Sequence, residues 1–197
     1  MLEATHAAQV AARRHELTPV VDQILARDQP FVFEVGCGNG HFLTAYAQAH
    51  PDQLCVGVDL SKDRIERSEK KRRRLGQGNV FFIRAEAADF LAVLPPPARF
   101  SAIYMLFSDP WPKRRHHKHR LLQETFLLAV AQHTELGVPF YFRTDHSDYF
   151  AAAAKEFTPE SGWIIADQPW GFEQVTLFQV RAQAYHSLVA IRAGIRR

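Results

Sequence analysis

The sequence predicts an α/β fold in which a mostly parallel sheet of about seven strands is covered by helices on both faces. Short apolar runs alternate along the chain with segments whose apolar residues recur every three or four positions, as on one face of a helix. A glycine-rich turn follows the first apolar run, and carboxylates follow several others. Strands that alternate with helices pair in parallel, and the carboxyl ends of such strands form a ligand-binding edge. The expected strands are residues 31–35, 54–58, 80–84, 103–107, 138–143, 163–165 and 185–191.

The first 30 residues are expected to be helical and to cover one side of the sheet. Thr18 and Pro19 are residue types that begin a helix, at its N-cap and in its first turn. The apolar residues that follow have the spacing of one buried face: Val20, Val21, Ile24 and Leu25. We therefore expect a helix to begin at Thr18.

Further helices are expected between the strands, with recognisable residues at their ends. Ser61 can cap a helix over residues 62–74, and Ser147 can cap an alanine-rich helix over residues 148–157. Gly137 stands where a glycine ends the helix that precedes the fifth strand.

The composition is that of an ordinary globular protein, with 47% hydrophobic and 23% charged residues. Its length suffices for one core, and we expect a single domain over residues 1–197. No apolar run approaches the roughly 20 residues that cross a bilayer, and the N-terminus lacks the pattern of a secretory signal. We expect a cytoplasmic protein with buried free thiols at Cys37 and Cys55. We expect no metal, because no Cys/His spacing resembles a zinc site.

Positive charge is concentrated in residues 62–74 and 113–120, although the net charge of the chain is only +3. A basic face on a nearly balanced protein is typical of nucleic-acid binding. The second stretch mixes arginine and histidine beside Trp111, which suits phosphates and stacked bases. A solvated charge run is the alternative for both stretches. In residues 62–74, the helix dipole stabilises each cation near the C-terminal end by ~0.3–1 kcal/mol. This stabilisation explains the presence of one or two of these cations but not of the whole cluster.

The glycine-rich turn after the first strand is the first candidate ligand site. Its sequence, Glu34-Val-Gly-Cys-Gly-Asn-Gly, places Gly36, Gly38 and Gly40 before a helix, where the backbone can approach a ligand closely. Dinucleotide sites have the spacing G-x-G-x-x-G, whereas this chain has G-x-G-x-G. The loop therefore looks like the S-adenosylmethionine loop of class I methyltransferases, with a purely structural turn as the alternative.

Carboxylates in and after the strands complete this candidate site. Asp59 follows the second strand, where a carboxylate can accept both hydroxyls of an adenosine ribose. Glu34 would be a buried acid in need of a cation, such as the amino or sulfonium end of S-adenosylmethionine. Glu86 follows the third strand and can reach an adenine amino group, with a surface acid as the alternative. Asp109 follows the run at residues 103–107 and is placed to face a ligand.

Taken together, these motifs resemble the bacterial tRNA (guanine-N7)-methyltransferase family, which has the Rossmann-like fold of class I methyltransferases. The resemblance covers residues 30–185 in order. Besides the motifs above it includes Asp109-Pro-Trp-Pro-Lys113 with the basic run behind it, and Thr144-Asp145-His-x-x-Tyr149. The Asp-Pro-Trp element with its basic run is the most specific part.

The resemblance implies transfer of a methyl group from S-adenosylmethionine to N7 of a guanine in the tRNA variable loop. It implies that Asp109 is catalytic and also contacts the cofactor. The other implied cofactor contacts are Glu34, Gly36, Gly38, Gly40, Asp59 and Glu86. The implied substrate contacts are Lys113, Asp145, Thr176 and Gln179. The implied contacts to the tRNA backbone are Arg114, Arg115, His116, His117, Lys118 and Arg120. The oligomeric state, monomer or homodimer, is not determined by the sequence.

One segment departs from the family pattern, because Thr-x-Phe-Glu appears here as Thr176-Leu-Phe-Gln179. A glutamine supplies no negative charge to a cationic base, although its carbonyl accepts hydrogen bonds. Thr with Gln three residues on is also a helix capping box. Two alternatives stay open: a methyltransferase of another RNA or of a small molecule, and an RNA-binding protein that has lost turnover. The basic run at residues 113–120 disfavours a small-molecule target, and intact Glu34 and Asp59 disfavour lost turnover.

Overall fold

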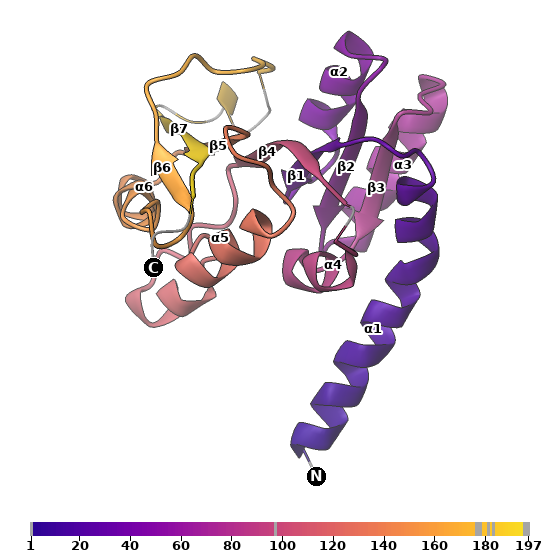
Figure 1. Ribbon diagram of the computed structural model, residues 1–197, viewed down its shortest axis with the longest axis horizontal. Helices are drawn as coiled ribbons and strands as arrows, with labels where there is room; N and C mark the ends of the chain where they lie inside the picture. Colours follow the sequence, from indigo (N-terminus) through magenta and orange to yellow (C-terminus); the bar gives the residue numbers. More distant parts are fainter. Residues whose placement is uncertain (1, 97, 176–178, 181, 183, 195–197) are drawn as a thin grey trace.

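The computed structural model describes residues 2–96, 98–175, 179, 180, 182 and 184–194 (Figure 1). Within these residues seven strands form one sheet in the order β3-β2-β1-β4-β5-β7-β6. The strands are β1 (Phe31–Val35), β2 (Leu54–Asp59), β3 (Val80–Arg84), β4 (Phe100–Leu106), β5 (Pro139–Thr144), β6 (Trp163–Ile165) and β7 (His186–Arg192). The first five pair in parallel, and only β7 runs against its neighbours β5 and β6. The predicted, mostly parallel sheet is confirmed.

The register of the central strands brings their carboxyl ends to one edge. Val35 at the end of β1 pairs with Val58 of β2 and with Met105 of β4. β1 and β2 are buried along their whole length, as expected of central parallel strands covered on both faces. The chain leaves β1 toward β2 and β3, and later returns to add β4 and β5 on the other side. This reversal is the kind of switch point at which open sheets bind ligands.

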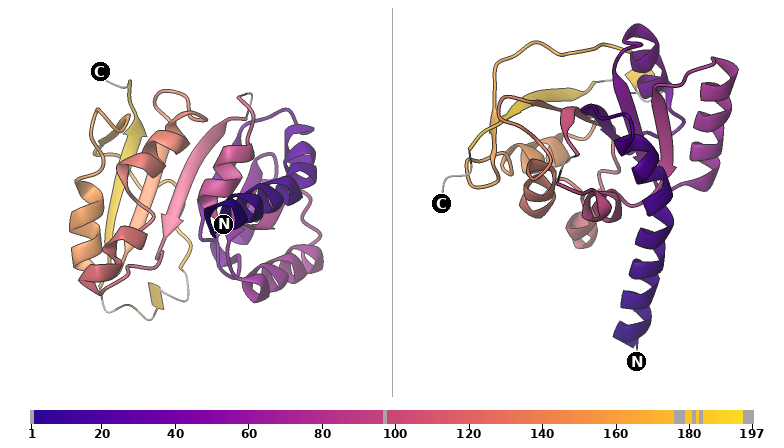
Figure 2. Two further views of the ribbon diagram at one scale, coloured as in Figure 1. Left: turned by 90° about the horizontal axis from the view of Figure 1, so that it is seen from below. Right: turned by 45° about the vertical axis from the view of Figure 1, so that its right-hand side comes forward.

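Helices lie on both faces of the sheet (Figures 1 and 2). The helices are α1 (Leu2–Leu25), α2 (His41–Ala49), α3 (Lys62–Arg74), α4 (Ala87–Val93), α5 (Glu124–Ala131), α6 (Ser147–Ala154) and the short 3-10 helix η1 (Arg114–His119). Apolar side chains of α1, α4, α5 and α6 share one buried cluster with the strands. Those of α2 and α3 belong to a second cluster on the other face, where Trp170 and Phe172 also pack.

The first helix does not begin at Thr18, because α1 runs without interruption from Leu2 to Leu25 with Pro19 inside it. Leu17 is buried together with Val21 and Ile24, so one apolar face begins before the proline and continues past it. This shared face favours a continuous helix although proline removes one backbone hydrogen bond. The N-terminal half of α1 extends away from the rest of the molecule (Figure 1).

Three other predicted helix ends are wrong, and the predicted cap of α3 is confirmed. The alanine-rich helix α6 ends at Ala154 rather than at residue 157. His146, not Ser147, is the N-cap of α6, and its Nδ1 accepts a hydrogen bond from the Tyr149 N–H at 3.3 Å. Gly137 lies beyond the end of α5, and its N–H donates to the Arg192 carbonyl at 2.9 Å. This glycine therefore forms the turn into β5, with φ at 84°. The hydroxyl of Ser61 caps α3 as expected, accepting from the Arg64 N–H at 3.4 Å.

Cys37 and Cys55 are buried free thiols, as predicted. In the part of the chain that the structure describes, no helix combines the length and the apolar character needed to cross a membrane.

Candidate active site

A cavity of about 670 Å³ opens at the carboxyl ends of β1, β2, β3 and β4. Five of the predicted site residues line it: Gly36, Gly38, Asp59, Glu86 and Asp109. Asp59 is the last residue of β2, and the others come from the loops after β1, β3 and β4; the parallel register brings these strand ends together. Further lining residues that bear on its chemistry are Leu60, Arg64, Phe107, Trp111 and His119.

The three glycines of the turn after β1 serve two different purposes. All three have positive φ, at 73° for Gly36, 53° for Gly38 and 65° for Gly40, a region that favours glycine. A Cβ on Gly36 or Gly38 would meet no described atom within 4 Å apart from its chain neighbours, so both face open space at the cavity. A Cβ on Gly40 would lie 2.7 Å from Cζ of Phe82. Gly40 does not line the cavity, and its place in the fold is a close contact between the start of α2 and β3.

Asp59 joins the glycine turn to the start of α3. Its Oδ2 accepts from the Gly38 N–H at 2.9 Å, and its Oδ1 accepts from the Ser61 N–H at 2.8 Å. The guanidinium of Arg64 lies 3.7 Å from Oδ2. Because a carboxylate has about four acceptor positions, both oxygens can take a further hydrogen bond from the cavity.

Glu34 lies behind the glycine turn and is only 4% exposed. Among the described residues its Oε2 has no hydrogen-bond partner. Burial, and then the charge of Asp59, raise the pKa of Glu34 well above its usual range, while Lys71 has a weaker opposite effect. The ammonium of Lys71 instead donates to the Asn39 carbonyl at 2.9 Å. Glu34 itself does not line the cavity, whereas the next two residues, Val35 and Gly36, do. A buried carboxylate whose oxygen lacks a described partner, so near the cavity lining, fits a cationic group of a bound molecule.

Asp109 lies in a constrained loop after β4. Its Oδ1 accepts from the Trp111 N–H at 2.9 Å. Phe107 and Trp111 on either side have φ of 53° and 45°, which is rare for residues other than glycine and is often found at functional sites. The Trp111 ring packs against His119 at 5.1 Å between centroids and also lines the cavity. The loop therefore holds Asp109 at the cavity wall by its own packing.

Most of the basic stretch after Asp109 forms η1, and its members differ in exposure. Lys113, Arg114, Arg115 and Lys118 are exposed, and His116 and His117 are half-buried. Arg120 is buried at 6% exposure. Its Nε donates to the Pro110 carbonyl at 2.7 Å, and its guanidinium carbon lies 5.0 Å from the centre of the Tyr149 ring. Arg120 thus braces the Asp109 loop from inside, contrary to the expectation of a contact with RNA.

Asp145 and Gln179, two further predicted substrate residues, are not among the residues that line the cavity. Asp145 is exposed just after β5, and the pairing of Leu106 with Arg143 places the ends of β4 and β5 side by side. Gln179 donates from Nε2 to Oε1 of Glu173 at 2.8 Å. Thr176 lies outside the described residues.

Sequence reasoning missed Arg143, the second-to-last residue of β5. Its guanidinium is joined to Glu173 by hydrogen bonds of 2.7 and 3.0 Å and lies between the rings of Trp170 and Tyr185. A signal was present, because an arginine within the apolar run Phe-Tyr-Phe-Arg is rarely buried without partners. Leu60 was missed too. It is a 65% exposed apolar residue directly after Asp59 at the cavity, where it could pack against the flat face of a base.

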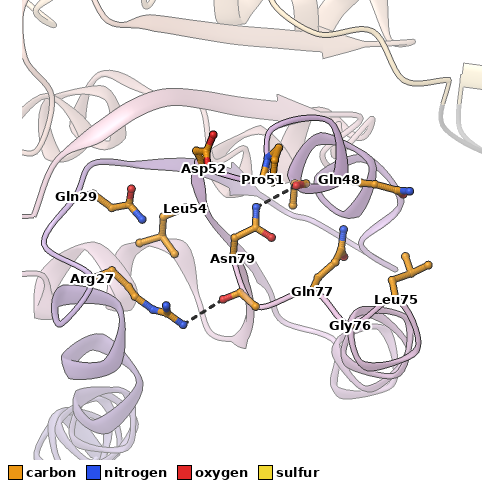
Figure 3. A pocket seen from close by; sticks show the side chains of 12 residues that line it. Arg27, Gln29, Gln48, Pro51, Asp52, Leu54, Leu75, Gly76, Gln77 and Asn79 are labelled. Atoms are coloured by element: carbon orange, nitrogen blue, oxygen red, sulfur yellow. Dashed lines mark hydrogen bonds between the residues drawn. The ribbon is translucent and has the colours of Figure 1, made fainter.

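A second cavity, of about 590 Å³, lies at the opposite edge of the sheet, beside the amino ends of β2 and β3 (Figure 3). The guanidinium of Arg27 donates to the Gly78 carbonyl at 3.2 Å, and the Asn79 amide donates to the Ala47 carbonyl at 3.0 Å. These polar groups are thus occupied within the protein. We place the functional site at the first cavity, because ligands of open parallel sheets bind at the carboxyl ends of strands.

A family model described as "Putative methyltransferase" matches residues 28–183. A tRNA (guanine-N(7)-)-methyltransferase of Mycobacterium ulcerans is 34% identical over 198 residues, which cover 98% of this chain and 70% of the relative. The chain belongs to the tRNA (guanine-N7)-methyltransferase family. The family member of Thermus thermophilus is 34% identical over 147 residues, 75% of this chain and 47% of its own length. The chain thus spans about half the length of that family member.

Solved structures support the fold. The 16S rRNA methyltransferase KamB has a TM-score of 0.61 at 19% identity, covering 87% of this chain and 92% of that chain. A 16S rRNA (adenine(1408)-N(1))-methyltransferase from Catenulisporales acidiphilia, with cosubstrate SAM, has a TM-score of 0.59 at 17% identity, covering 91% and 92%. The predicted Rossmann-like class I methyltransferase fold is confirmed.

Proposed function

We propose that this chain transfers a methyl group from S-adenosylmethionine to N7 of a guanine in tRNA, at the variable loop. One observation carries the proposal. In this member of the family, Asp59, Glu86 and Asp109 line the same cavity at the glycine turn. We propose that the protein is located in the cytoplasm, because its proposed substrate, tRNA, is present there.

Four features of the site suit the cofactor. The buried carboxylate oxygen of Glu34, which has no partner among the residues that the structure describes, suits its amino group. Asp59 keeps acceptor positions for the ribose hydroxyls. Glu86 is exposed at the cavity, 4.0 Å from Arg13, and suits the adenine amino group. The open backbone at Gly36 and Gly38 lets the ligand approach closely. The cofactor, when bound, supplies the methyl group on a positively charged sulfur.

The reaction demands alignment rather than proton transfer. Guanine N7 carries a lone pair in the plane of the ring, so it needs no general base. The lone pair forms the new carbon–nitrogen bond, the electron pair of the broken bond stays on sulfur, and the positive charge passes to the guanine. The protein must hold the base in line with the methyl group, which is catalysis by proximity.

Asp109 and Asp145 are the carboxylates suited to the developing positive charge. Asp109 lines the cavity, and Asp145 follows the neighbouring strand β5. Either can also accept from the N1–H and the exocyclic amino group of guanine. We propose that Lys113 binds a phosphate or O6 of the base. We propose that Gln179 and Thr176 also contact the substrate.

The exposed cations of η1 suit the tRNA backbone. Arg114, Arg115 and Lys118 are exposed beside the cavity wall formed by Trp111 and His119. His116 and His117 are half-buried and complete this surface. Phosphate contacts of this kind set the position of the RNA without reading its sequence.

The test is methyl transfer from labelled S-adenosylmethionine into unmodified bulk tRNA, followed by nucleoside analysis. A 7-methylguanosine peak is expected. A different methylated nucleoside would place the target atom elsewhere, and a protein that binds tRNA and cofactor without transfer would be one that has lost turnover.

A further inference from the structure

Helix α3 carries more positive charge than the protein as a whole. Its sequence, KDRIERSEKKRRR, has eight cationic and three acidic residues. The helix is therefore more positive than the chain, whose net charge is +3, and all other residues together are net negative. This concentration exceeds what stabilisation by the helix dipole explains, because that effect is confined to the last turn.

The acids of α3 do not neutralise its outer cations. Glu66 pairs with Lys62 at 3.8 Å, and Glu69 pairs with Arg72 at 2.9 Å. Asp63, in the first turn, forms no ion pair with another described residue. Four exposed cations have no acidic partner in the described part of the chain; we call them the α3 basic face: Arg67, Lys70, Arg73 and Arg74.

The α3 basic face has a regular geometry. Ile65 and Ser68 are the buried residues of the helix, and Arg67, Lys70 and Arg74 lie on the opposite side with spacings of three and four. At about 1.5 Å for each residue they span about 10 Å of the surface. Lys70 and Arg74 are like charges four residues apart, an arrangement that destabilises a helix. A bound polyanion would relieve this repulsion.

Side-chain contacts fix α3 to the candidate active site. The hydroxyl of Ser68 donates to the Gly38 carbonyl at 3.0 Å, and the ammonium of Lys71 donates to the Asn39 carbonyl at 2.9 Å. Arg64, one turn before Arg67, lines the cavity itself. The α3 basic face thus begins beside the cavity and has a fixed position relative to it, on the β2 side, whereas η1 flanks it on the β4 side.

We propose that the α3 basic face binds the phosphate backbone of the same tRNA whose guanine enters the cavity, as a second contact beside η1. This inference rests on the proposed function. An RNA backbone suits the surface better than a membrane does, because an interfacial helix needs large apolar residues beside its cations. The exposed positions of α3 carry none.

The test compares two double variants of equal charge. Arg67→Gln with Arg74→Gln removes two cations of the α3 basic face, and glutamine keeps the helix propensity. Arg99→Gln with Lys155→Gln removes two cations outside α3 and η1, one just before β4 and one just after α6, and serves as the control. Binding of unmodified tRNA is measured over a series of salt concentrations, with thermal unfolding as a check on folding.

In the α3 variant we expect the plot of log K for tRNA binding against the log of the salt concentration to become less steep. The magnitude of its slope should decrease by about 1.4–1.8, or roughly 0.7–0.9 for each lost phosphate contact. The control should keep the wild-type slope. At saturating tRNA the α3 variant should methylate at the wild-type rate, because these cations touch no reacting atom, whereas its KM for tRNA should rise. A wild-type slope in the α3 variant would overturn this inference and leave a solvated helix face. A wild-type protein that forms no 7-methylguanosine would instead overturn the proposed function.

Discussion

The guanidinium of Arg143 is joined to the carboxylate of Glu173 by hydrogen bonds of 2.7 and 3.0 Å. Trp170 and Tyr185 lie over the same guanidinium at 4.0 and 4.8 Å, within the range of cation–π attraction. Arg143 stands two residues before Asp145. The cluster therefore attaches the segment after β6 to the part of β5 that leads into the proposed substrate site.

Gln179→Glu should destabilise the protein, because Nε2 of Gln179 donates to Glu173 at 2.8 Å and a glutamate there would bring two carboxylates together. Adding Glu173→Gln should recover most of the loss, since one carboxylate would remain for Arg143. Contacting residues commonly couple by about 0.5–3 kcal/mol. Thermal unfolding at pH 7 of both single variants and the double variant measures the coupling. Additive effects would show that the two side chains do not interact.

Glu34→Gln should stabilise the protein in the absence of S-adenosylmethionine, increasingly so as pH rises. Burial, with Asp59 nearby, holds the pKa of Glu34 well above its usual 4.5. The folded state therefore retains a proton that the unfolded state releases. The stability that Glu34 contributes is complete at pH values below its pKa in the unfolded state. It is lost as the pH rises through its pKa in the folded state. Urea unfolding of both proteins at a series of pH values from about 4 upward measures this difference.

The same substitution should weaken cofactor binding by about 2 kcal/mol or more, because a charged partner is lost in a buried site. Calorimetry should show proton release when the wild type binds the cofactor, and less release for the variant. A variant that is less stable at every pH yet binds the cofactor normally would give Glu34 a purely structural role.

The sequence predicted most of the sheet and its ligand edge because those signals are local. A strand and the acid that follows it, such as Asp59 or Asp109, are adjacent in the chain, and parallel pairing then brings these acids together. The contacts of Arg120 have no such local signal, and for Arg143 the apolar run around it indicates only that partners are needed. Whether an arginine faces solvent or braces a loop depends on side chains far away in sequence, here Tyr149 and Glu173.

Gly40→Ala should cost more stability than Gly38→Ala. Both positions have positive φ, where a Cβ costs roughly 1–2 kcal/mol. At Gly40 the new methyl would also meet Phe82 at 2.7 Å, and overpacking adds about 1–3 kcal/mol. Chemical denaturation gives both free energies of unfolding. Equal losses would mean that the contact with Phe82 relaxes freely.

Asp89→Asn should destabilise the protein at neutral pH and have little effect in acid. Burial alone would raise the pKa of Asp89, but hydrogen bonds from Arg14 and Arg13 at 2.9 and 3.0 Å hold it below its usual 3.8. A carboxylate whose pKa is lowered by folding stabilises the protein at pH values above its pKa in the unfolded state. This stabilisation is lost as the pH falls through its pKa in the folded state. The difference in Tm between wild type and variant should therefore shrink below about pH 4. A constant difference would attribute the effect to packing of α1 on α4.

Asp109→Ala should abolish methyl transfer while largely sparing tRNA affinity, because the phosphate contacts come from other residues. The carboxylate has a second task, since it accepts the Trp111 N–H at 2.9 Å, and alanine removes this as well. Asp109→Asn separates the two, because its amide oxygen can still accept that hydrogen bond while the negative charge is gone. If the charge stabilises the guanine as it becomes cationic, asparagine should lose most of the rate, by a factor on the order of 10² or more. Single-turnover transfer to tRNA, with tRNA affinity measured alongside, decides between these roles. Normal transfer by Asp109→Asn together with loss by Asp109→Ala would leave Asp109 as a support for the Trp111 loop.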